Sequence, residues 1–287
     1  MLADVRKSLV RESYDQEAER YRDASDMQLL NLTRLLSLST TALQKLKAKR
    51  ILDVGCGLGP AVAVLIERGL LDEADYLGLD LSPEMIAGAK KVHESERVKF
   101  RVGDAEAIEL ADGSVDLVLS NSALHWLNQP KFSMTPAKAF REMYRVLRPA
   151  GVLAVSTAAI GKAERFLKVY RTVLARWNDR SGFDSGQYTE DPINRLHLHE
   201  LVDLALGANF EVEIGQLHYQ PYQLPNVHAY LNAVRAYGFT SFMAPITPEL
   251  RENVWSEVSQ EYAESVGDGP YVHDYYVAYV IAHKGNH

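Results

Sequence analysis

The chain has 287 residues, of which 47% are hydrophobic, and its formal net charge is -7. An acidic chain without a cluster of Lys and Arg side chains offers no track for phosphates, which argues against nucleic acid as a partner. One cysteine and no signal-peptide pattern favour the cytoplasm, and no apolar run approaches the roughly 18 residues of a membrane span.

The first half of the chain alternates helices and strands. Apolar periodicity predicts helices over residues 4–22 and 26–47. Strands are then expected at 50–54, 74–80, 98–102, 114–120 and 152–157, helices at 60–69, from Pro83 onward and at 136–147, and a turn at 149–151. Ser82 is the expected cap of the helix that begins at Pro83. This alternation predicts a parallel, doubly wound α/β sheet.

The second half of the chain is less regular. Helices are expected at about 161–178, 194–207, 226–237 and 248–264, strands at 209–217 and 271–283, and a loop at 179–192. Because no internal repeat, low-complexity tract or linker divides the chain, we expect a single domain.

A glycine-rich turn lies directly between the first strand and the next helix, in the run DVGCGLG at residues 53–59. Its glycines, which let the backbone bend sharply and a ligand approach the main chain, are Gly55, Gly57 and Gly59. A dinucleotide fingerprint would need a glycine where Pro60 stands. Asp53 would repel a pyrophosphate but suits an ammonium group. S-adenosylmethionine has an ammonium and no phosphate, so the turn favours it over NAD.

Two more acids follow strands. Asp80 ends the second strand, where its carboxylate can accept both hydroxyls of a ribose. Asp104 follows the third strand and is placed to accept from an adenine amino group, with the Ala105 N–H facing a ring nitrogen. The alternative for Asp104 is an Asx-turn residue. The other side chains expected to contact the cofactor are Cys56, which also serves as small filler, Leu81 and Met85.

These runs resemble the class I S-adenosylmethionine-dependent methyltransferases. ILDVGCGLGP is similar to their first motif and YLGLDLSPEMI to their second-strand acidic motif. VGDAEAIEL, VDLVLSNSALHW and RVLRPAGVLAVST resemble the later motifs, so the resemblance covers about residues 50–157 in order. It implies that Asp53 lies near the ligand's amino group, Asp80 on the ribose and Asp104 at the adenine. It also implies a last strand antiparallel to the rest, for which 271–283 is the candidate.

The N-terminal segment narrows the resemblance to one branch of these methyltransferases. Tyr14-Asp15-x-x-Ala18-x-x-Tyr21, followed by Gln28, resembles the type-11 branch. That branch includes the malonyl-carrier-protein O-methyltransferases of biotin synthesis and the ubiquinone/menaquinone C-methyltransferases. The resemblance implies that this helix covers the cofactor and that Tyr14 and Tyr21 contact it. The branch usually has Phe where Tyr14 stands, and residues 158–287 match none of these enzymes well enough to carry over a substrate.

Two side chains after the fourth strand are candidates for contacting the methyl acceptor or the methionine part of the cofactor. His125 either orients the acceptor or takes a proton, or it stacks beside Trp126 as a cavity wall. Asn121 either bonds near the methionine part of the cofactor or caps the next helix. His197 and His199 stand two apart on an expected helix and should diverge, so no metal site is expected.

The sequence therefore predicts a methyltransferase that converts S-adenosylmethionine to S-adenosylhomocysteine. Residues 1–48 form a helical cover, 49–157 the cofactor-binding core, and 158–287 the lid insertions with the last two strands. Because the insertions are rich in Tyr, Phe and Leu, they suit an enclosed small-molecule or carrier-bound acceptor. O-methylation of a carboxylate is the first hypothesis. The alternatives are C- or O-methylation of a quinone-like or phenolic metabolite, or a non-catalytic cofactor-binding protein.

Overall fold

The computed structural model describes residues 7–8, 10–12, 14–15, 26–128, 135–159, 164–181, 195–236, 247–267 and 269–286. The chain divides into two compact units. The first, here called the sheet unit, comprises residues 25–160, 195–218 and 277–287. The second, the helical unit, comprises residues 1–24, 161–194 and 219–276. That the two units work as one methyltransferase domain stays a prediction.

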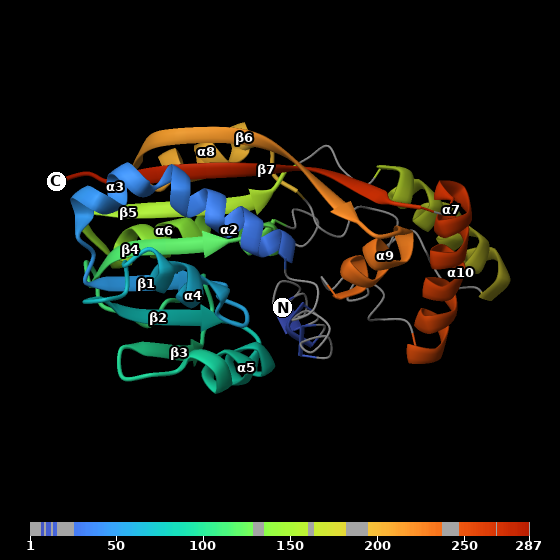
Figure 1. Ribbon diagram of the computed structural model, residues 1–287, viewed down its shortest axis with the longest axis horizontal. Coiled ribbons are helices and arrows are strands. Elements are labelled where there is room, and N and C mark those ends of the chain that lie inside the picture. Colours follow the sequence, from blue (N-terminus) through green and yellow to red (C-terminus); the bar gives the residue numbers. More distant parts are fainter. Residues whose placement is uncertain are drawn as a thin grey trace. The chain divides into compact units, whose positions relative to one another are not determined.

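Seven strands of the described chain form one sheet in the order β3-β2-β1-β4-β5-β7-β6 (Figure 1). They are β1 (Arg50–Val54), β2 (Asp75–Asp80), β3 (Val98–Val102), β4 (Val115–Asn121), β5 (Leu147–Ala158), β6 (Phe210–Leu224) and β7 (Tyr271–Lys284). The first five run parallel, whereas β7 pairs antiparallel with β5, from Val152 opposite His283 to Ala158 opposite Val277. The predicted fold class and the antiparallel last strand are confirmed.

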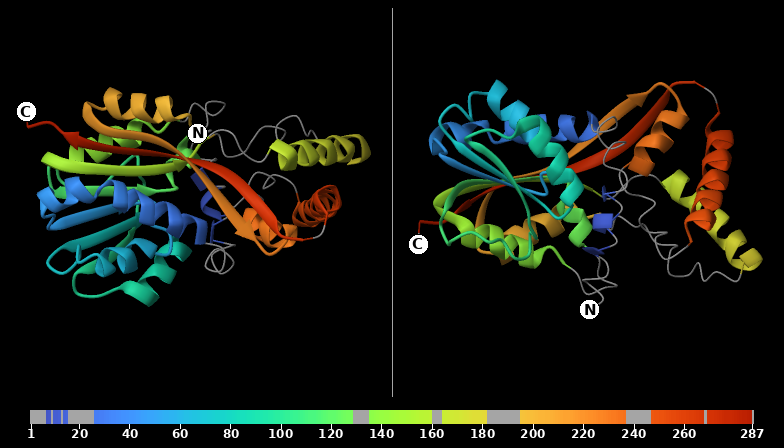
Figure 2. Two further views of the ribbon diagram at one scale, coloured as in Figure 1. Left: turned by 45° about the horizontal axis from the view of Figure 1, so that its top comes forward. Right: turned by 90° about the horizontal axis from the view of Figure 1, so that it is seen from below.

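The centre of the sheet is fully buried, which explains the almost continuous apolar runs in its strands. Leu52, Val118 and Leu153, from three neighbouring strands, are each 0% exposed. Strands covered by helices on both faces need this pattern, unlike the alternating pattern of a half-exposed sheet. Within the sheet unit α2 packs on α4 and α6 packs on α8, so helices cover both faces (Figure 2).

The helices of the sheet unit mostly follow the sequence. They are α2 (Asp26–Leu38), α3 (Thr40–Leu46), α4 (Pro60–Glu67), α5 (Pro83–His93), η1 (Leu124–Leu127), α6 (Ala137–Val146) and α8 (Leu198–Gly207). The Ser82 cap is confirmed, because its hydroxyl accepts from the Met85 N–H at 3.1 Å. The single helix expected at 26–47 is wrong. The chain breaks at buried Ser39, whose hydroxyl donates to the Leu35 carbonyl at 2.7 Å, a bond that bends helices.

Two strand predictions also need correction. The turn expected at residues 149–151 lies inside β5, where the pairing with β4 shifts register and Ala150 takes a left-handed φ of 59°. The strand expected at 209–217 continues to Leu224. The extension contains Pro221, which β6 tolerates because it is the edge strand of the sheet.

The helical unit is built around α7 (Glu164–Ser181), α9 (Val227–Ala236) and α10 (Pro248–Val266). Its core is rich in aromatic rings. Buried examples are Phe166, Tyr170, Tyr230, Trp255 and Tyr262. Trp177 on α7 donates to Glu257 on α10 at 2.8 Å, which ties the two helices together. None of the helices in the described ranges combines the length and the apolarity that crossing a membrane requires.

Candidate functional site

The glycine turn after β1 has a backbone that only glycine adopts easily. Gly55, Gly57 and Gly59 have φ values of 73°, 53° and 79°, in the left-handed region. A Cβ on Gly55 would lie 2.3 Å from the Ala123 Cβ, so no side chain fits there. The turn is therefore pressed against the segment that follows β4, and the carboxyl ends of β1 and β4 meet at one edge.

Asp80 is held by the backbone of this edge. Its Oδ2 accepts from the Gly57 N–H at 2.8 Å, and its Oδ1 accepts from the Ser82 N–H at 2.9 Å. A carboxylate offers about four acceptor positions, so two bonds of this kind orient the group without exhausting it. The half-buried carboxylate thus fits the predicted role of accepting ribose hydroxyls.

Asp53 lies beneath the turn and is only 3% exposed. Burial raises the pKa of its carboxyl to about 7; the hydrogen bond from the Tyr76 hydroxyl, 2.7 Å long, lowers it, and nearby Asp80 raises it further. A positive group placed here would favour the charged form, as the predicted ammonium contact requires. Burial also raises the pKa of the Cys56 thiol well above its usual range. Cys56 therefore lies here as a neutral thiol, packed closely against Gly78.

The structure gives Asp104 the geometry of the alternative interpretation. Its Oδ1 accepts from the Glu106 N–H at 2.9 Å, as in an Asx-turn. Asp104 and Ala105 are half-buried beyond the end of β3, and their contact with an adenine stays a prediction. Leu81 is half-buried, whereas Met85 is 1% exposed and belongs to the core, so contacts of both with a cofactor also stay predictions.

Asn121, at the end of β4, joins three elements. Its Nδ2 donates to the Gln28 carbonyl of α2 at 3.0 Å, and its Oδ1 accepts from the Ser156 hydroxyl of β5 at 2.6 Å. The helix-capping alternative is wrong, because the residue in the N-cap position of η1 is Ala123 and no side chain caps it. Contact of Asn121 with the methionine part of the cofactor stays a prediction.

His125 lies on η1 and is 6% exposed. Its ring centroid is 5.2 Å from that of Trp126, with the two rings tilted by 44° instead of stacked, and both interpretations of His125 stay predictions. Its Nδ1 also lies 3.1 Å from the hydroxyl of Thr157, near the end of β5. Sequence reasoning missed Thr157 and Ser156. The signal was their place at the end of a parallel strand, because such strand ends share the ligand-binding edge.

Four further residues complete the comparison with the sequence. Tyr14 lies in a helical segment, and Tyr21 lies outside the described residues. His197 and His199 do not diverge as predicted: their rings stack 5.2 Å apart, because His197 precedes α8 as its cap instead of lying within the helix. In the described part of the chain no three His, Cys, Asp or Glu side chains come together as a metal site would need.

Known proteins resemble the chain in this core and beyond it. Residues 52–155 match the family model "Methyltransferase domain". A malonyl-[acyl-carrier protein] O-methyltransferase from Marinomonas sp. is 26% identical over 283 residues, which cover 95% of this chain and 92% of the relative. The protein of that name from Hahella chejuensis is 37% identical over 153 residues, 53% of this chain and 50% of the relative. Residues 52–155 therefore form a methyltransferase domain, and the protein is an S-adenosylmethionine-dependent methyltransferase.

The methyltransferase shares its fold with solved structures of low sequence identity. The [4+2]-cyclase SpnF superposes with a TM-score of 0.52 at 20% identity, over 88% of this chain and 81% of that one. A cyclase on this fold shows that architecture alone does not fix the reaction. The cofactor of the methyltransferase is S-adenosylmethionine, and the glycine turn with the carboxylates of Asp53 and Asp80 beside it fits the ammonium and hydroxyl groups of that molecule.

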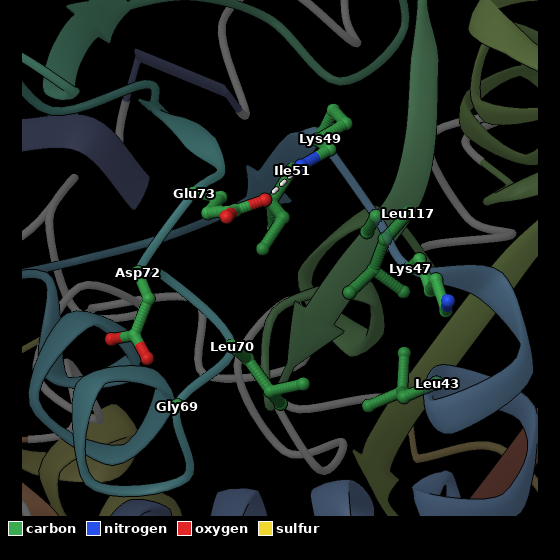
Figure 3. Close-up of a pocket in the computed structure, with 10 residues that line it drawn as sticks. Leu43, Lys47, Lys49, Ile51, Gly69, Leu70, Asp72, Glu73 and Leu117 are labelled. Carbon is green, nitrogen blue, oxygen red and sulfur yellow. Dashed lines mark hydrogen bonds and ion pairs between the residues drawn. The ribbon is translucent and has the colours of Figure 1, made fainter.

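A pocket of about 340 Å³ lies at the opposite edge of the sheet, near the start of β1 (Figure 3). Leu43, Ile51 and Leu117 supply apolar lining, and an ion pair between Lys49 and Glu73 lies beside them. The glycine turn and the acids described above are at the carboxyl ends of the strands, where α/β sheets bind ligands. This pocket is therefore not the methyl-transfer site.

Proposed function

We propose that the methyltransferase O-methylates a carboxylate on a small or carrier-bound acyl acceptor. The observation that carries the proposal is the similarity to the Marinomonas malonyl-[acyl-carrier protein] O-methyltransferase. That match spans 95% of the chain and so extends well beyond residues 52–155, where the family model ends. The shared part thus includes the second half of the chain, which contains the expected lid insertions.

Methyl transfer to a carboxylate requires little from the protein beyond positioning the acceptor and the cofactor. Bound S-adenosylmethionine supplies an electrophilic methyl group. A carboxylate acceptor is already a nucleophile, so the protein has to align it and exclude water and needs no general base. In this proposal the His125 ring, buried and bonded to Thr157, orients the acceptor by hydrogen bonding and takes no proton from it.

The helical unit contains most of the residues of the predicted lid segments, 158–195 and 225–265. We propose that they enclose the acceptor, a role supported by their aromatic content. The cytoplasmic location likewise stays a prediction. A phenol or carbon acceptor would require a base, for which His125 is the nearest candidate; this alternative is an outcome of the test below.

The test supplies the protein with S-adenosylmethionine labelled in its methyl group, together with malonyl-carrier protein, free dicarboxylates and phenols in separate reactions. We expect label on the malonyl-carrier protein, released as methanol by mild base, because a methyl ester hydrolyses whereas an aryl ether or a C-methyl group does not. Asp80→Asn is the control that should reduce labelling when the cofactor is not saturating. Base-stable label on a phenol alone would reject the carboxylate, and cofactor binding without label on any acceptor would favour the non-catalytic alternative.

A further inference from the structure

The side chain of Gln28, in the first turn of α2, has an unused acceptor. The residue is half-buried, and its Oε1 is buried with no hydrogen-bond donor in reach among the described residues. A buried carbonyl oxygen without a partner is destabilising unless something else brings the donor. Such an atom next to a ligand-binding edge therefore points to a group of the ligand.

Gln28 is held at that edge by its backbone. The Asn121 side chain donates to the Gln28 carbonyl and is itself fixed by the Ser156 hydroxyl. One turn further along α2, Asn31 donates to the Ser122 hydroxyl at 3.3 Å. Ser122 has a left-handed φ of 57°, and its N–H donates to the Ser156 carbonyl at 2.9 Å. These bonds fix the start of α2 against the carboxyl ends of β4 and β5.

The strand order indicates which part of the cofactor reaches Gln28. Neighbouring strands β3, β2, β1 and β4 carry at their ends Asp104, Asp80, the glycine turn and Asn121, in that order. A cofactor with its adenine at β3 and its ribose at β2 extends its methionine part toward β1 and β4. The ammonium of that part has only donors, which is what an amide oxygen requires.

We propose that the Gln28 Oε1 accepts a hydrogen bond from the ammonium of bound S-adenosylmethionine, and that Asn121 is a positioning residue that holds Gln28 in place. The proposal rests on the cofactor site of the proposed function but not on its acceptor. Binding measured without any acceptor therefore tests it separately from the carboxylate hypothesis.

The first experiment compares two probes by calorimetry. S-adenosylhomocysteine carries the ammonium, whereas 5′-methylthioadenosine lacks the whole amino-acid part. We expect Gln28→Met to weaken S-adenosylhomocysteine binding about tenfold or more, and 5′-methylthioadenosine binding less than about twofold. Gln28→Glu keeps an acceptor and adds a negative charge beside the ammonium, so it should bind S-adenosylhomocysteine at least as tightly as the wild type at pH 8. Equal affinity of Gln28→Met and wild type for S-adenosylhomocysteine, or equal losses for both probes, would overturn the assignment.

The second experiment separates positioning from direct contact at Asn121. In Asn121→Asp the side chain can still accept from Ser156 but can no longer donate to the Gln28 carbonyl. We expect S-adenosylhomocysteine affinity to fall about fivefold, with faster hydrogen exchange at the start of α2. If Asn121 itself contacted the ammonium, the added carboxylate would tighten binding, and that result would contradict the positioning role. Asn209→Asp, on an exposed turn, is the charge-matched control.

Discussion

Carboxyl groups at the two ends of the strands have pKa values shifted in opposite directions. The ends where the parallel strands begin are here called the amino edge, and the ends where they finish the carboxyl edge. At the amino edge Asp116 accepts from the N–H groups of Lys49 and Arg50, each at 2.8 Å, and pairs with Arg148. Burial alone would raise the pKa of Asp116, but these hydrogen bonds and the Arg148 charge hold it below its usual value. At the carboxyl edge, burial instead raises the pKa of Asp53 to about 7.

The carboxyl groups at the two edges of the sheet thus have different roles, in stability at the amino edge and in function at the carboxyl edge. The amino edge satisfies its charges with groups of its own, so its carboxylates stabilise the fold. The carboxyl edge keeps a buried carboxyl whose charge is not compensated, at the place where a positive group of the cofactor is expected. Binding sites commonly sacrifice stability in this way, and each edge can be tested for it.

The largest expected effect comes from Asp53→Asn, which removes the buried charge and keeps an acceptor for Tyr76. The folded-state pKa of about 7 lies above the unfolded value near 3.8, so the native state holds the proton more tightly between these values. Wild-type stability therefore falls as pH rises from about 4 to 7. We expect the variant to gain up to about 4 kcal/mol at pH 8 and nothing near pH 3.5, measured by urea unfolding.

The same residue predicts a pH dependence of cofactor binding. If the ammonium pairs with Asp53, binding lowers the pKa of the carboxyl below 7, and wild-type affinity should increase as pH rises from 6 to 8. Asp53→Asn should bind more weakly at pH 8 and lose this dependence. A stabilised variant with unchanged affinity would place the ammonium elsewhere.

The next effect is on affinity at the end of β2. Asp80→Ala should weaken cofactor binding by about 2 kcal/mol or more, because hydrogen bonds to a charged acceptor are lost. The matched control is Asp75→Ala, which removes an exposed carboxylate from the other end of the same strand. Calorimetry should show a loss for the first variant only, and equal affinities in folded protein would contradict the ribose assignment.

A smaller effect is expected at the amino edge. Asp116→Ala removes the acceptor of two backbone N–H groups and should lower the free energy of unfolding by about 1 to 2 kcal/mol, without changing cofactor affinity. Because the pKa of Asp116 is lowered in the folded state, its contribution is present above the unfolded value and disappears as pH falls through the folded one. Urea unfolding at pH 7 and at pH 2.5 checks both statements.

The smallest effect is expected at the Lys49–Glu73 pair beside the amino-edge pocket. Both side chains are largely exposed, 61% and 79%, so solvent screens their attraction. Lys49→Ala should leave the Tm and the cofactor affinity unchanged. A clear fall in Tm would show that this edge depends on its surface charges as well as on Asp116.

Much of this site follows from local sequence. Glycines at 55, 57 and 59 are needed wherever the backbone turns left-handed against a neighbour, and an acid after each of two strands marks the edge. The position of Thr157 at a strand end was visible in the sequence, but its bond to His125 and the double role of Asn121 were not predictable, because these depend on residues far apart in the chain. The stacking of His197 on His199 depends on where α8 begins, which the sequence placed too early.

The sequence by itself determined the alternation of strands and helices, the glycine turn and the chemical character of the binding edge, because these depend on periodicity and on single-residue backbone preferences. Only the tertiary structure decided which carboxyl has a raised pKa, which side chains orient one another and where long elements break. Those outcomes depend on burial and on hydrogen bonds across the sheet, as for Asp53 beneath its turn and Ser39 between two helices. Neither burial nor a partner distant in the chain is recorded in a local pattern of residues.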